Sequence, residues 1–395
     1  MKLPFLESPV KKFQTHRPLA WAQLSHQKVR LAVAMSGIAF ANVLIFMQLG
    51  FRSLFTDGAK LLPANLKGDL FLLNKSADYI GASNFERIRV YQASGIKGVA
   101  KVTPVYVKTG ILAYSKENIS YAPRVFAFNP TNQSPFDIPE VNQQLEKLKL
   151  PDSVLFDRRA RASLEPISTL FEQKGNVTAI LNNHRVSVIG LFTLGNSFFR
   201  GEANLIMSDS NYARLYGEDE LKQVSVGVLS LKQNANVEAV KAGIEASVPN
   251  VLVLTHKELI AKEIAYQDKN PSGAIFSFGA AMGFVVGVVI VYQVLYADIS
   301  DHQSEYATLK AMGYSDKALL EIIFQEASIL AVLGFIPGFI VSFGMYKVLT
   351  VITRLELTMS PNIVMTVFVL TLIMCIASAA IASNKLRSSD PADVF

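Results

Sequence analysis

The chain has 395 residues, of which 50% are hydrophobic and 18% are charged, and it carries a net charge of +6 at neutral pH. A mean hydropathy of +0.29 is too high for an ordinary soluble protein, and the charged fraction is too large for a protein that lies wholly within a membrane. No basic stripe with interleaved aromatic residues occurs, so the positive charge indicates orientation in a membrane and attraction to anionic lipids rather than binding of nucleic acid.

Four stretches without Asp, Glu, Lys or Arg dominate the sequence, at 31–51, 270–297, 327–346 and 357–384. A helix needs about 20 mainly apolar residues to cross a hydrocarbon core of roughly 30 Å. Each stretch is long enough and therefore predicts a transmembrane helix. The first is expected to be retained rather than cleaved as a signal peptide, because 30 residues precede it.

The spacing of these stretches predicts an α-helical membrane protein with four transmembrane helices in a 1+3 arrangement and a large mixed α/β periplasmic domain between the first two helices. The expected parts are an N-terminal segment with an interfacial helix at 1–28, transmembrane helices at 29–51, 273–297, 322–347 and 361–384, a periplasmic domain at 52–272, a coupling loop at 298–321, a short periplasmic loop at 348–360 and a tail at 385–395.

The charges outside these helices predict the orientation of the chain. The flank before the first helix is basic, which favours a cytoplasmic N-terminus, and four spans then return the C-terminus to the cytoplasmic side of the cell inner (plasma) membrane. The acidic balance of the coupling loop runs against this orientation. Pro18 and Trp21 favour a short interfacial helix before the first span, and a disordered basic tail is the alternative.

Two β-α-β elements are predicted at the ends of the periplasmic domain, around 69–107 and 224–255. In the first, Ser83 and Glu86 have the spacing of a capping box, which predicts that a helix begins there and runs through Tyr91.

A β-rich subdomain is expected at about 111–201, inserted between these elements, so that the domain has two subdomains. Residues 257–268 predict a stalk helix. The single cysteine, Cys375, lies in the fourth apolar stretch, so the periplasmic domain is expected to be held by its core without a disulfide.

Glycines recur at a spacing of four residues in two of the expected spans. They are Gly279, Gly283 and Gly287 in the second span and Gly334 and Gly338 in the third. Such a repeat places bare backbone on one helix face, where another helix can approach closely. Packing within one chain is the expected use of these faces, and a subunit interface is the alternative.

Motifs for catalysis or for cofactor and metal binding do not occur. The histidines lack the spacing of metal ligands, and neither a nucleophile elbow nor a phosphate-binding P-loop occurs. We therefore expect no catalytic, cofactor or metal site and no enzyme activity, so that a partner must hydrolyse any ATP. Glu326 is expected near the inner end of the third span, where its carboxylate would reach water.

The most specific segment runs from Asp298 to Gly338. The second span is expected to continue as helix to Met312, Gly313 to take a left-handed C-cap, and Ser315 to start the next helix. The side chains expected to face a docking partner are Glu305, Tyr306, Leu309, Lys310, Met312 and Tyr314. A solvated helical hairpin without a partner is the alternative.

Glu305, residues 310–313, Glu326 with its neighbour Gln325, and the glycines at 334–338 follow one another in an order that resembles FtsX/MacB-type ABC transporter permeases. The ending at 390–395 resembles the C-terminal signature of these permeases, and the 1+3 arrangement is similar as well. Within this family, the sequence is most similar to the DevC family of cyanobacterial-type exporter permeases, over PLAWAQLSHQKVRLAVAMSGIAFA from Pro18 and NLIMSD from Asn204.

The resemblance implies a homodimeric permease that binds a separate ABC ATPase subunit and works with a periplasmic adaptor (membrane fusion) protein and an outer-membrane TolC-like channel. ATP-driven closure of the ATPase would push on the coupling loop, and motion of the periplasmic domain would export a lipid-like or glycolipid substrate. The alternative is an FtsX-like mechanotransducer that regulates a periplasmic cell-wall hydrolase. A membrane-anchored enzyme is a third alternative, against which the lack of catalytic motifs counts.

Overall fold

The computed structural model describes residues 28–114, 119–131, 133–195, 201–269, 271–353 and 357–388. These residues divide into two compact units. The helical unit takes its residues from 1–48, 278–344 and 359–395, and the α/β unit takes its residues from 49–277 and 345–358. The interfacial helix expected before Lys28 and the signature at 390–395 lie outside the described residues.

Four helices are long and apolar enough to cross a membrane, as the charge-free stretches predict. They are α2 (Lys28–Ala64), α10 (Pro271–Asp301), α12 (Asp316–Thr353) and α13 (Pro361–Ser388). The first helix does not end near residue 51 but continues past Arg52 and Asp57 to Ala64. A charged residue limits how far a helix lies in hydrocarbon, but it does not end the helix.

In the helical unit, the repeated glycines of α10 and α12 pack against α2, and the contacts lie within one chain. A Cβ atom at Gly283 would lie 3.2 Å from Ile45 Cγ1, and one at Gly334 would lie 2.6 Å from Ile38 Cβ. Gly279, Gly287 and Gly338 likewise meet Gln48, Ala41 and Asn42 of α2. The glycine faces of α10 and α12 therefore lie against α2. Cys375 of α13 is buried in the core of the same unit.

The two predicted β-α-β elements of the α/β unit share one sheet and interleave. They consist of β1 (Leu70–Asn74), α3 (Arg87–Ser94) and β3 (Val99–Thr109), and of β12 (Val226–Leu231), α8 (Val237–Ser247) and β13 (Val251–Thr255). Their strand order is β13-β1-β12-β3, and every neighbouring pair is antiparallel. This is the split β-α-β arrangement, in which each element places a strand between the two strands of the other.

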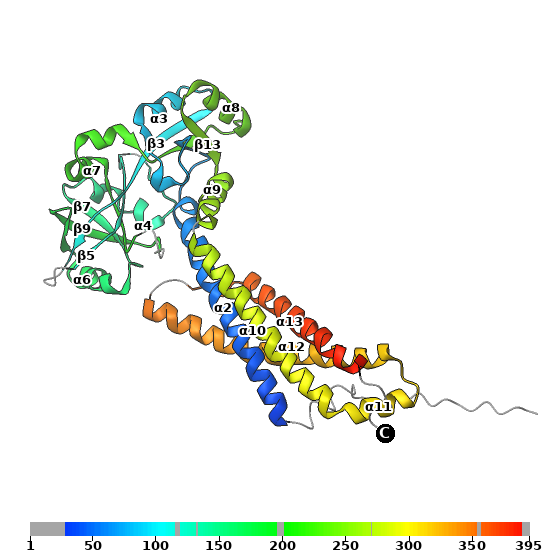
Figure 1. Ribbon diagram of the computed structural model, residues 1–395. Coiled ribbons are helices and arrows are strands. Elements are labelled where there is room, and N and C mark those ends of the chain that lie inside the picture. Colours follow the sequence, from blue (N-terminus) through cyan, green and yellow to red (C-terminus); the bar gives the residue numbers. More distant parts are fainter. Residues whose placement is uncertain are drawn as a thin grey trace, which may run out of the picture. The chain divides into compact units, whose positions relative to one another are not determined.

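The inserted segment extends the same sheet from β3, as Figure 1 shows, to eleven strands among the described residues. Its strands, in spatial order, are β6 (Arg124–Phe128), β10 (Asn204–Ser208), β7 (Ser153–Asp157), β9 (His184–Phe192), β8 (Val177–Leu181), β4 (Leu112–Ala113) and β5 (Ser120–Tyr121). No break in the sheet marks a boundary between two subdomains in this part of the structure, so that division stays a prediction.

Helices cover both faces of this sheet. They are α4 (Pro139–Asn142), α5 (Leu145–Leu148), α6 (Glu165–Lys174), α7 (Asp209–Tyr216) and α9 (His256–Asp268), with 3-10 turns η1 (Ile80–Ala82), η2 (Ala162–Leu164) and η3 (Glu218–Lys222). In β1, Leu70 and Leu72 join the core on one face, whereas Phe71 and Leu73 join the core on the other. Burial on both faces explains why this strand is an uninterrupted apolar run.

The capping box predicted at Ser83 is wrong. Ser83 is buried, and its Oγ accepts a hydrogen bond from the backbone N–H of Asn74 at 3.0 Å. The helix begins at Arg87, because Phe85 and Glu86 form strand β2, which pairs with β11 (Gln223–Val224). Strand pairing with a segment far away in the sequence therefore overrides the local capping signal.

Asp157 joins three segments of the α/β unit in its core. Its carboxylate accepts hydrogen bonds from the backbone N–H groups of Arg159, Leu194 and Gly195 and from Nδ2 of Asn204, at 3.0, 3.3, 3.1 and 2.6 Å. Burial raises the pKa of Asp157, and these hydrogen bonds oppose that rise because they stabilise the charged form.

We expect Asp157→Ala to lower the free energy of unfolding by about 3 kcal/mol, because it leaves several buried donors without an acceptor. Pulse proteolysis of the full chain in detergent would measure the change. Asp137→Ala is the matched control, since Asp137 is exposed and its loss should change that free energy by less than about 0.5 kcal/mol. Equal effects of the two variants would contradict the prediction.

Candidate functional site

The predicted coupling segment forms a short helix between α10 and α12. The second span does not continue to Met312, because α10 ends at Asp301 and α11 (Gln303–Ala311) begins after His302. At the end of α11, the N–H of Tyr314 donates to the carbonyl of Leu309 at 3.1 Å, and the N–H of Gly313 donates to that of Lys310 at 3.0 Å.

These two hydrogen bonds form a Schellman motif, which requires a left-handed residue after the helix. Gly313 occupies that position with φ +95°, a conformation that a side chain would strain. Ser315 then accepts a hydrogen bond at its Oγ from the N–H of Ala318 at 3.4 Å, where α12 begins. The turn between the two helices is therefore fixed by backbone geometry.

The side chains of the coupling segment divide between a buried face and an exposed face. Tyr306 is only 2% exposed and lies in the core of the helical unit, and Leu309 packs against the same core. The prediction that Tyr306 faces a partner is therefore wrong. Positions 306 and 309 share one face of a helix, so their spacing could have indicated that both side chains pack against the core.

The exposed face carries Glu305, Met312 and Tyr314. The Glu305 side chain is 63% exposed, Met312 is 64% exposed and Tyr314 is 53% exposed, while Lys310 is partly buried. Glu305 lies on α11, and Met312 and Tyr314 lie in the turn that follows this helix. Together these exposed side chains offer a surface suited to bind another protein.

A group of charged residues lies beside the start of α11. From α2, Arg30 Nη1 lies 3.2 Å from Asp298 Oδ1, and Arg30 Nη2 contacts Asp301. His302 Nε2 lies 3.8 Å from Asp298 Oδ1, and its Nδ1 lies 3.8 Å from Glu305 Oε1. This group was not predicted from the sequence, because charges at the ends of two apolar stretches do not show that the two helices lie side by side.

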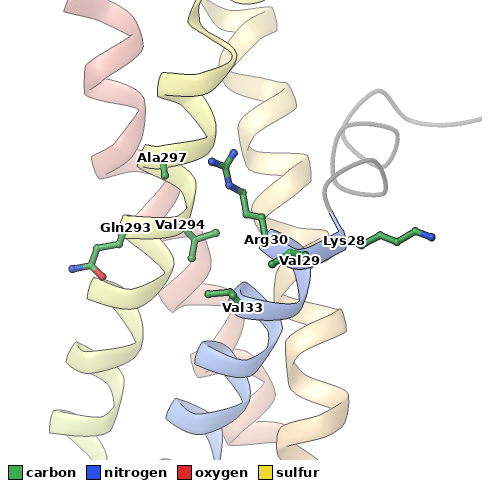
Figure 2. A pocket seen from close by; sticks show the side chains of 7 residues that line it. All are labelled: Lys28, Val29, Arg30, Val33, Gln293, Val294 and Ala297. Carbon is green, nitrogen blue, oxygen red and sulfur yellow. The ribbon is translucent and has the colours of Figure 1, made fainter.

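A groove of about 770 Å³ lies between the start of α2 and the end of α10. Figure 2 shows Val29, Val33 and Val294 along it, with Arg30 directed toward α10 and Lys28 directed away. Its apolar lining and cationic end are those expected of a surface in contact with phospholipid.

In the α/β unit, the predicted stalk helix α9 is joined to the 3-10 turn η1 by a buried hydrogen bond and an aromatic contact. Glu263 is fully buried, and its Oε1 accepts a hydrogen bond from the N–H of Ile80 at 2.6 Å. Tyr266 stacks on Tyr79 with ring centroids 4.3 Å apart. A capping box of Thr255 and Glu258 begins the helix directly after β13.

Glu258 also pairs with a cation of helix α8. Lys241 Nζ lies 2.7 Å from Glu258 Oε1, and the hydrogen bond from Lys241 is the main cause that lowers the pKa of Glu258. The start of α9 is thus joined to α8 as well as to β13. Among the described residues, no group of three His, Cys, Asp or Glu side chains is placed to hold a metal ion.

Residues 277–391 match the family described as FtsX-like permease C-terminal. The matched range includes α11, Gly313, α12 and α13. It therefore contains the whole predicted coupling loop at 298–321. None of the curated proteins matches the chain. The family match covers less than a third of the chain, and it supports an FtsX-like permease C-terminal domain over the matched residues.

Solved structures of two transporter domains are similar to part of the chain. The periplasmic region of MacB from Actinobacillus actinomycetemcomitans is 11% identical, with a TM-score of 0.33, over 49% of this chain and 91% of that chain. The extracellular domain of the ABC-type transporter YknZ from Gram-positive bacteria is 12% identical, with a TM-score of 0.33, over 48% of this chain and 100% of that chain.

Proposed function

We propose that the chain is the permease subunit of an ABC exporter in the cell inner membrane, without ATPase or other enzyme activity of its own. The family match over residues 277–391 supports this proposal. FtsX/MacB-type permeases work with an ABC ATPase, and the exposed face of Glu305, Met312 and Tyr314 is the surface that the ATPase would contact.

The coupling would begin as a push on α11. Tyr306 and Leu309 join this helix to the core of the helical unit, so a force on the exposed face displaces the core and not a loose loop. Because α10 runs as one helix from Pro271 to Asp301, a displacement at one end is conducted along its axis to the other. The stalk helix α9 precedes α10 in the chain and is joined to the 3-10 turn η1 through Glu263 and Tyr266.

The sequence resemblance supports a proposal for the oligomeric state, the partners and the substrate of the permease. The permease would be a homodimer of the DevC type, with cytoplasmic termini and a periplasmic α/β unit. A periplasmic adaptor and a TolC-like outer-membrane channel would complete a tripartite efflux assembly, which exports a lipid-like or glycolipid substrate by mechanotransmission. The observation that carries the permease function is the FtsX-like match, whose range includes the coupling helix α11.

Purification of the chain from its native membrane, followed by identification of bound subunits and lipids, tests this function. We expect an ABC ATPase to co-purify, with an adaptor protein and enriched lipid in the same complex. A complex with a cell-wall hydrolase and no adaptor would replace the export proposal by the transducer alternative. A chain that purifies without any ATPase would contradict both.

We expect Met312→Ala combined with Tyr314→Ala to weaken binding of the co-purified ATPase by roughly tenfold or more, because large apolar side chains at the centre of an interface contribute about 1–2 kcal/mol each. Binding of the purified ATPase to permease in nanodiscs would be measured. Ile336→Ala is the matched control, because Ile336 is 49% exposed but lies within the apolar part of α12. Unchanged affinity in the double variant would contradict the docking surface.

A further inference from the structure

Two buried carboxyl groups of the helical unit meet where α10 and α12 pack together. Asp298 near the end of α10 is 6% exposed, and Glu326 of α12 is 2% exposed. The expectation that Glu326 reaches water is therefore wrong. Both residues flank the apolar core that contains Ile299, Ile323 and Tyr306, so little solvent is present to stabilise two negative charges.

The hydrogen-bonding pattern of the pair is incomplete if both groups are ionised. Asp298 Oδ2 and Glu326 Oε2 are both buried, and neither accepts a hydrogen bond from an N–H or O–H group in the part of the chain that the structure describes. The two side chains lie close enough for their charges to interact. Because an ionised carboxylate only accepts hydrogen bonds, neither group can satisfy the other unless one of them carries a proton.

The charges around the pair also favour protonation of one of the two carboxyl groups. Arg30 of α2 supplies one positive charge, which it divides between Asp298 and Asp301. His302 lies beside Asp298, and Glu305 of α11 lies on the far side of that imidazole. Helix α13 contributes no Asp, Glu, Lys or Arg between residues 361 and 384. Among the side chains that the structure describes, three carboxylates would then face one guanidinium unless a proton is bound.

We propose that Asp298 and Glu326 form a binding site for a single proton, which the two carboxyl groups share and which holds α10 and α12 together beside the coupling segment. The proton converts a repulsive contact into a hydrogen bond between two buried oxygens. Its release leaves two like charges facing each other and separates the two helices at the base of α11. This site stands on the geometry of the pair and is independent of the permease function.

The site has a direct spectroscopic test in the full chain, reconstituted in nanodiscs. Infrared difference spectra recorded between about pH 6 and about pH 9 report the C=O stretch of a protonated carboxylic acid. We expect one such band in the wild type, which disappears as the pH rises. Glu326→Gln and Asp298→Asn should each abolish the band, because either amide can donate to the remaining carboxylate in place of the shared proton.

Glu321→Gln is the matched control, since Glu321 is exposed on the same helix, and this variant should keep the band. A wild-type spectrum without the band would overturn the proposal. So would a band that survives either Glu326→Gln or Asp298→Asn, because the proton would then belong to one group alone. A band that persists unchanged across the pH range would overturn the release step.

Thermal unfolding of the same variants keeps the proposal testable if one of them folds poorly. The folded chain holds a proton that the unfolded chain releases, so rising pH should favour the unfolded state and lower the unfolding midpoint of the wild type. The unfolding midpoint of Glu326→Gln should fall by several degrees less than that of the wild type over the same pH range. Parallel pH dependence of the wild type and this variant would argue against the site.

Discussion

Leu309→Pro is expected to abolish stimulation of the partner ATPase while the chain still inserts in the membrane. Position 309 lies inside α11, where proline removes the N–H group of the helical hydrogen bond and its ring clashes with the preceding turn, at a cost of about 3 kcal/mol. The same change removes the leucine that anchors the helix to the core. ATP turnover of the reconstituted complex should fall roughly tenfold or more, to the rate of the isolated ATPase.

Thr308→Ala separates loss of the helix from loss of a side chain. Thr308 is exposed and its Oγ1 donates a hydrogen bond to the carbonyl of Ser304 within the same helix, so this variant should retain stimulation. Normal stimulation by Leu309→Pro would refute the role of α11. Loss of stimulation in both variants would show that the effect does not depend on breaking the helix.

Gly334→Leu is expected to be the most disruptive single change in the helical unit. A Cβ atom at this position would lie 2.6 Å from Ile38 Cβ, a branched atom close to the backbone that cannot move away as a flexible chain end can. The larger side chain must therefore separate α12 from α2, at a cost of about 3 kcal/mol or more. We expect a much lower yield of folded chain and an unfolding midpoint in detergent that falls by several degrees.

Gly344→Leu is the matched control for this prediction. Gly344 lies on the same helix, and a Cβ atom there would have no neighbour within 4 Å among the described residues. The unfolding midpoint of this variant should therefore stay close to that of the wild type. If both variants behave alike, helix propensity rather than contact with α2 determines the result.

The sequence predicted the features that follow from local pattern. Charge-free stretches identified the four apolar helices, because a hydrocarbon core excludes charge along about 20 consecutive residues. The glycine spacing identified faces that pack closely, and Gly313 identified the left-handed residue at the end of the coupling helix. Each of these signals depends on a physical restriction that acts within a few helical turns.

Features that depend on distant contacts could not be predicted from such patterns. Ser83 and Glu86 look like a capping box, but pairing of Phe85 with Val224 decides the local structure. The interleaving of β1 with β12 and β13 likewise depends on partners more than 100 residues away in the chain. A local pattern of residues indicates which apolar surfaces are buried, but it does not identify the distant segment that covers them.

The charged group near the coupling segment shows the same limit. Arg30 and Asp298 looked like flanking charges of two separate spans, because nothing in the local sequence places α2 beside α10. Glu326 looked like a boundary residue that reaches water, because depth was judged from the sequence position and burial depends on neighbouring helices. The contacts of this candidate site therefore come from tertiary packing alone.

The burial of Cys375 has a practical consequence for measuring motion in this protein. It is the only cysteine of the chain, and its side chain is fully buried in the helical unit. A thiol in such a position reacts slowly with polar reagents. A cysteine introduced at an exposed position such as Tyr314 would therefore be the preferred target for a spin label or fluorophore, without prior removal of the native thiol.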